Sequence, residues 1–155
     1  MDALLSIKPE FVEKIFSGEK RYEFRRTSFR DSDAIDTVFL YASSPTQEIV
    51  GAFTIDDVIE DTPDNLWMQY QEESGFQRRQ RFMDYFTGVE TGYAYKIDEV
   101  HQLQNSVNPW EFDDEFVPPT SFYYVNGEIP SRAREAISES LRSAYTPRVE
   151  EYGSD

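Results

Sequence analysis

The segment from Gly18 to Arg26, GEKRYEFRR, holds the residue types in this chain best suited to chemistry. Aromatic and charged residues alternate after position 21, which is the period of a strand with one face on the core. On such a strand Glu23 and Arg25 leave the same face, because residues two apart point the same way. Lys20 stands just before the strand. The spacing therefore predicts a compact cluster of one carboxylate and two cations.

Three kinds of chemistry are open to this cluster. The cations could bind a phosphate group. Glu23 could accept hydrogen bonds from the edge of a base, or a lysine with a lowered pKa beside it could run acid–base chemistry. The alternative is an ion-paired strand face in water, which contributes only ~0–1 kcal/mol to stability.

The elements that must position the cluster follow from the pattern around it. Leu4–Lys8 is typical of a buried strand, and a helix begins at Pro9 and ends at Gly18, where a left-handed residue fits. Further along, apolar periodicity predicts strands at 37–41, 48–59 with a bend near Gly51, 91–103 and 121–125, and helices from 62, at 76–86 and at 130–144, with residues 104–120 irregular. Short strands with irregular connections and inserted helices indicate a mixed or antiparallel barrel-like α+β fold.

Length and composition exclude several classes of protein. A chain of 155 residues is expected to form one domain. With no cysteine and the single histidine His101, disulfides, thiol catalysis and zinc sites of the usual kinds are not expected. The N-terminus has no signal-peptide pattern and no apolar run reaches the ~18 residues of a membrane span, so a cytoplasmic protein is expected.

The charge is unevenly distributed. The formal net charge is −15, yet residues 8–30 carry seven basic and four acidic side chains. One positive island suits a small cleft and not a long duplex, which would require a broad basic face. High acid content with little lysine also suggests adaptation to a salty, halophilic cytoplasm.

The chain resembles ASCH-domain proteins of the PUA-like superfamily. Their signature, Gly-x-Lys-x-x-Glu-x-Arg, is similar to Gly18, Lys20, Glu23 and Arg25. The resemblance covers roughly residues 3–125, and it continues through LLSIKP at 4–9, YASSP at 41–45, IVG at 49–51, Trp67, YFTG at 85–88 and PPTSF at 118–122. The subset that looks most similar consists of archaeal and phage proteins described as predicted RNA-binding or transcription-linked regulators.

The resemblance implies a small PUA-like β-barrel, mixed or antiparallel, with inserted and flanking helices. Residues 1–128 would form this domain, and 129–155 a C-terminal helix with an acidic tail. Lys20, Glu23 and Arg25 would point into a cleft that binds RNA or a modified nucleotide, and we expect Lys8, Ser43 and Ser44 to line it as well. No cofactor or metal is expected, and the protein is expected to be a monomer or weak dimer.

Two alternatives stay open. Some small ASCH proteins remove an acetyl group from acetylated cytidine and others are associated with ribonuclease activity, so Lys20 and Glu23 could be catalytic. Here Glu23 occupies the position of the hydroxyl residue that the deacetylases use, and Glu72 or Glu73 could replace their distant glutamate. Alternatively, the chain is a regulator that binds a protein partner through helix 130–144. Other side chains with possible ligand roles are more readily explained as core (Trp67, Tyr70, Trp110) or as a solvated helix face (Arg78, Arg79, Arg81).

Overall fold

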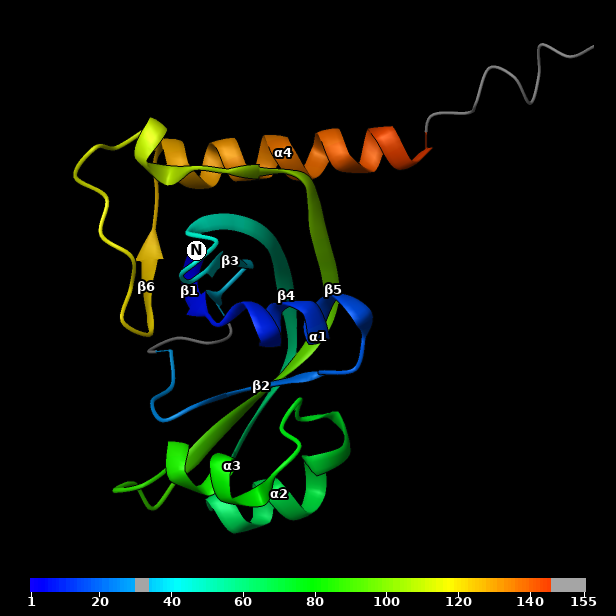
Figure 1. The fold of residues 1–155 in the computed structure, drawn as a ribbon, viewed down its shortest axis with the longest axis vertical. Coiled ribbons are helices and arrows are strands. Elements are labelled where there is room, and N and C mark those ends of the chain that lie inside the picture. Colours follow the sequence, from blue (N-terminus) through cyan, green and yellow to red (C-terminus); the bar gives the residue numbers. More distant parts are fainter. Residues whose placement is uncertain (30–33, 146–155) are drawn as a thin grey trace, which may run out of the picture.

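The computed structural model describes residues 1–29 and 34–145, with side chains up to residue 142. One six-stranded sheet organises the chain, in the order β2-β5-β4-β3-β1-β6. Its strands are β1 (Asp2–Ile7), β2 (Tyr22–Arg25), β3 (Thr37–Ala42), β4 (Glu48–Asp61), β5 (Gly92–Val107) and β6 (Phe122–Val125). β1 and β3 run parallel and every other neighbouring pair is antiparallel. The sheet is therefore mixed, and it curls into a half-barrel (Figure 1).

Within residues 1–29 and 34–145, α-helices and short 3₁₀ turns accompany the sheet. α1 (Pro9–Ser17) follows β1, α2 (Pro63–Tyr70) and α3 (Arg79–Tyr85) stand between β4 and β5, and α4 (Glu128–Tyr145) follows β6; the 3₁₀ turns are η2 (Gln71–Glu73) and η3 (Pro109–Glu111). α2 and α3 gather at one end of the molecule and α4 runs across the other (Figure 1). The α+β fold expected from the sequence is confirmed.

The core has three parts that match these layers. One lies between the sheet and α1, a second between the sheet and α4, and a third holds α2 and α3 against β2 and β5. Ala133 and Ala136 of α4 are buried together with Leu4 and Phe39 of the sheet. Because α4 begins at Glu128, the division at 128/129 would fall in its first turn; that division stays a prediction.

The predicted bend of β4 at Gly51 is present. The register with β5 shifts between Ile49 and Gly51. A Cβ at Gly51 would stand 2.5 Å from the carbonyl oxygen of His101 and 2.6 Å from the Phe16 ring. The missing side chain thus allows the strand to approach β5 and α1 closely.

Several predicted boundaries were wrong. β1 spans Asp2–Ile7 and not Leu4–Lys8, and β4 ends at Asp61 and not at residue 59. β5 continues to Val107, so residues 104–107 are strand and not irregular. The helix predicted over 76–86 spans only Arg79–Tyr85, because Phe76 donates its backbone N–H to the Ser74 hydroxyl and belongs to a turn. The helix predicted over 130–144 starts two residues earlier. Arg30 and the predicted acidic tail after 145 lie outside the described residues.

No helix within residues 1–29 and 34–145 is long and apolar enough to cross a membrane.

Candidate functional site

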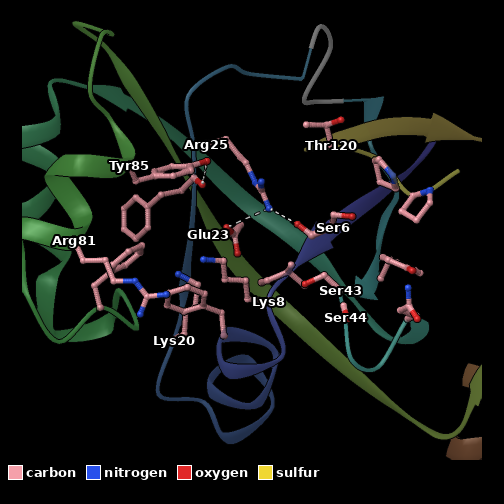
Figure 2. Close-up of a pocket in the computed structure, with 18 of the residues that line it drawn as sticks. Ser6, Lys8, Lys20, Glu23, Arg25, Ser43, Ser44, Arg81, Tyr85 and Thr120 are labelled. Carbon is pink, nitrogen blue, oxygen red and sulfur yellow. Dashed lines mark hydrogen bonds and ion pairs between the residues drawn. The ribbon is translucent and has the colours of Figure 1, made fainter.

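A cleft of about 720 Å³ opens where β1, β2, α1 and α3 meet. It is lined by all six residues predicted as ligand contacts, Lys8, Lys20, Glu23, Arg25, Ser43 and Ser44 (Figure 2). The local sequence explains why they meet. α1 follows β1 directly and ends at Gly18, and β2 comes next along the chain. The Ser43–Ser44 turn follows β3, the strand that pairs with β1.

Lys20 is the most deeply buried charged residue of the cleft, with 2% of its surface exposed. Its ammonium donates to the carbonyl oxygen of Ser74 at 2.5 Å. The amine lies 5.1–5.4 Å from the centroids of three phenyl rings, those of Phe11, Phe24 and Phe76. Burial among these groups lowers the pKa of Lys20 from 10.5 to about 8, and the nearby Glu23 carboxylate offsets part of that effect.

The turn at residues 74–76 is shaped around this lysine. Gly75 has a φ of +80°, and a Cβ there would come within 2.9 Å of the Lys20 Cδ atom. Lys14 of α1 donates to the carbonyl oxygen of Gly75 at 2.7 Å. Two lysines are thus bonded to consecutive carbonyl groups, but only Lys20 lines the cleft.

Glu23 and Arg25 form a buried pair on β2. Arg25 Nη2 lies 3.5 Å from Glu23 Oε1, and the two residues are 8% and 7% exposed. The same guanidinium donates to the carbonyl oxygen of Ser6 at 3.1 Å and to the hydroxyl of Ser121 at 3.2 Å. Since β2 and β6 are the two edges of the sheet, Arg25 also bridges the open side of the half-barrel.

One polar atom of each partner lacks a hydrogen bond to the described part of the chain. Within the described residues, Glu23 Oε2 and Arg25 Nε are buried and unpartnered. Buried polar atoms are nearly always hydrogen-bonded, because leaving one bare costs ~1–3 kcal/mol. Because Glu23 and Arg25 line the cleft, a ligand that reaches this pair would supply the donor and the acceptor that the two atoms lack.

Several cleft residues were not predicted from the sequence. Phe76, Arg81 and Tyr85 come from the α2–α3 segment, and Thr120 comes from the segment before β6. The Tyr85 hydroxyl donates to the carbonyl oxygen of Phe24 at 3.1 Å, and burial raises the pKa of Tyr85. Only the YFTG and PPTSF motifs of the resemblance marked these regions.

Arg81 lies at the mouth of the cleft. It pairs with Glu10 at 2.5 Å, and its guanidinium carbon stands 5.0 Å from the Phe11 ring centroid. Arg79 pairs with Asp64. Asp64 and Glu10 are therefore the carboxylates that balance Arg79 and Arg81.

The other aromatic candidates belong to the core. Trp67 packs against Phe82, Tyr70 stacks on Tyr22, and Trp110 contacts Phe116. Neither tryptophan lines the cleft. Among the described residues, no group of three or more His, Asp or Glu side chains is arranged to hold a metal ion.

Comparison with known proteins now identifies the family. The profile of the ASCH domain matches residues 5–117. The chain belongs to the ASCH domain family. The resemblance noted in the sequence is thereby confirmed, and the site described above lies almost wholly within the matched range.

Two relatives extend this result. A Zymomonas mobilis protein described as an ASCH domain-containing ribonuclease is 29% identical over 131 residues, which cover 82% of this chain and 86% of that protein. The crystal structure of ASCH from Zymomonas mobilis superposes with a TM-score of 0.72 at 26% identity, covering 92% of this chain and 94% of that one. The N-terminal domain of Staphylothermus marinus McrB, at a TM-score of 0.54 and 10% identity over 89% of this chain and 93% of that one, shares the fold alone.

Proposed function

We propose that this protein is an RNA-directed ASCH module whose cleft binds one nucleotide of a single strand. The bare, buried Glu23 Oε2 and Arg25 Nε atoms carry the proposal. A base edge or a sugar hydroxyl supplies the donor and acceptor that these atoms lack. The volume supports it too, since about 720 Å³ falls within the ~300–1,000 Å³ of sites for ligands of this size.

The charge of the cleft fits an anionic ligand of limited length. Four cationic side chains and two acidic ones line it, on a chain whose net charge is −15. The cations hold one or two phosphate groups, whereas the acidic surroundings repel a longer duplex. Lys8, Ser43 and Ser44 contribute polar groups to the cleft (Figure 2). Phe11 and Phe76 also line it, and their rings offer surfaces on which a base can stack.

RNA cleavage is the second candidate. It is favoured by the lowered pKa of Lys20 beside Glu23 and by the name of the Zymomonas mobilis relative. In this scheme Glu23 takes the proton of the 2′-hydroxyl, whose oxygen attacks the phosphorus. The bond from phosphorus to the 5′-oxygen breaks, and protonated Lys20 gives that oxygen its proton. The deacetylase alternative stays a prediction, as does a protein partner on α4.

Binding and cleavage can be measured on one sample. A fluorescein-labelled single-stranded RNA of ten nucleotides is titrated with protein by fluorescence polarisation, in low and high KCl, and then run on a denaturing gel. Lys20→Met is expected to raise the Kd by about 10–100-fold, because a charge-assisted contact is worth ~1–3 kcal/mol. Loss of a cleavage product in the same variant would favour the second candidate.

Lys14→Met is the matched control, because Lys14 bonds the neighbouring carbonyl without lining the cleft. It is expected to change the Kd by less than about threefold. Equal Kd values for Lys20→Met and the unmodified protein would contradict the assignment of the cleft.

A further inference from the structure

The surroundings of Lys20 are those of a nucleophilic amine as much as of a phosphate-binding cation. Within the described residues, no carboxylate lies within ion-pair distance of its Nζ atom, because Glu23 pairs with Arg25 instead. Its hydrogen-bond partner is the neutral carbonyl of Ser74, and three phenyl rings fill the space around it. A lysine desolvated in this way is neutral in part near physiological pH and can attack a carbonyl carbon.

The position of Lys20 restricts which carbonyl can reach it. Lys20 lines the cleft with only 2% of its surface exposed, so a carbonyl group that meets its amine there has to be slender. A complete nucleotide carries its base on C1′ and presents no carbonyl there. When a nucleotide has lost its base, its sugar ring can open to a chain that ends in an aldehyde at C1′. The phosphate groups on either side of this sugar still fit the cations of the cleft.

We propose that Lys20 forms an imine with the C1′ aldehyde of an abasic nucleotide, and that the protein thereby cleaves single strands at abasic sites. The inference rests on the proposed function in one respect, which is that the cleft admits a nucleotide of a single strand. Its chemistry is separate, because it requires a primary amine at position 20 and no transfer of a 2′-hydroxyl proton.

The steps balance with water as the only other reactant. The Nζ atom adds to the aldehyde carbon, and loss of water forms the C=N bond. Glu23 Oε2, buried and unpartnered in the same cleft, takes a proton from C2′. The C3′–O bond then breaks, and the phosphate leaves as the 5′-terminal monoester of the downstream fragment. Hydrolysis of the conjugated imine returns the Lys20 amine and releases an unsaturated aldehyde on the upstream fragment.

Borohydride trapping tests the imine directly. Labelled 15-nucleotide strands with one central abasic site, in deoxyribose and ribose forms, are incubated with the protein and sodium cyanoborohydride. We expect a covalent adduct that peptide mass spectrometry places on Lys20, among the four lysines at 8, 14, 20 and 96. The two sugars distinguish a DNA from an RNA source of the same aldehyde, and an adduct with either supports the proposal.

Two arginine variants sharpen the assignment. Lys20→Arg keeps the positive charge without a nucleophilic amine, and trapping is expected to fall at least tenfold. Lys14→Arg keeps the cleft unchanged and is expected to trap as the unmodified protein does. Circular dichroism checks that Lys20→Arg is folded, and if it is not, the mapped position of the adduct in the unmodified protein decides alone.

Different results would contradict the imine and the proposed nucleotide binding. An adduct on another amine, or none while the strand binds by polarisation, would overturn the imine and leave nucleotide binding intact. Absence of binding for both the abasic strand and the matching intact strand would overturn both.

Discussion

Charged side chains are arranged differently on the outer helices and in the cleft. On the surface Arg79 meets Asp64 at 2.5 Å and Arg132 meets Glu135 at 3.2 Å, with 38–68% of each side chain exposed. In the cleft Glu23 and Arg25 are 3.5 Å apart and nearly buried, and each keeps one polar atom without a partner among the residues that the structure describes. Burial makes the second arrangement the more costly one.

The difference indicates what each region is organised for. Exposed ion pairs are screened by water and contribute ~0–1 kcal/mol. A buried pair loses much more solvation than its attraction recovers unless all its atoms are bonded. A cleft with unsatisfied charges is therefore poorly explained by stability alone, and it is well explained by a ligand that completes the bonds.

Among the variants that test this comparison, Arg25→Met is expected to change the free energy of unfolding most. Arg25→Met leaves the Glu23 carboxylate buried without its cation and removes the bridge to Ser6 and Ser121. We expect a loss of about 3 kcal/mol in the free energy of unfolding, measured by urea denaturation. Adding Glu23→Gln to this variant should recover part of the loss, because the stranded charge is then gone.

A loss below about 1 kcal/mol for Arg25→Met would contradict this account of the cleft. It would mean that water or a rearranged side chain satisfies Glu23 as readily as Arg25 does.

The protonation of Lys20 is expected to have the next largest effect on the free energy of unfolding. Its pKa is lowered from 10.5 to about 8, chiefly by burial, while Glu23 raises it and Arg25 and Lys14 lower it. Between these two values the unfolded chain holds a proton that the folded chain has released. The free energy of unfolding therefore rises with pH in this window.

Comparison with Lys20→Met isolates this contribution. The stability of the unmodified protein relative to that variant is expected to increase by up to about 3 kcal/mol between pH 7 and pH 10.5. Urea denaturation of both proteins across this range measures the difference. A constant difference would show that the pKa of Lys20 in the folded protein is an ordinary one.

The sequence predicted the cleft residues whose positions follow from short segments of the chain. A helix end and a strand of period two place Lys20, Glu23 and Arg25 within reach of one another. Ser43 and Ser44 were expected beside them in the cleft that the family resemblance implied, and the structure brings all five residues to one cleft. These elements depend on short-range patterns, in which propensity and alternation act together.

The remaining cleft residues are positioned by contacts between segments that lie far apart in the chain, and no local pattern encodes such contacts. Arg25 bonds Ser121 across a separation of 96 residues. The α2–α3 segment lines the cleft because the carbonyl groups of Ser74 and Gly75 bind two lysines, and that same turn delays the start of α3 to Arg79. The local bond between Phe76 and Ser74 and these tertiary contacts together override the helical pattern that began at Phe76.

The exposed pair of Arg79 and Asp64 is expected to give the smallest effect. Arg79→Met should lower the free energy of unfolding by less than about 1 kcal/mol, since both side chains are more than half exposed. At 1 M KCl the Debye length is ~3 Å, so this small effect should disappear. The loss in Arg25→Met should persist in the same salt, because ions do not enter the buried pair. Urea denaturation of both variants at 0.1 M and 1 M KCl separates the two regions, and a salt-sensitive Arg25 effect would mean that the cleft charges are as solvated as those of the surface.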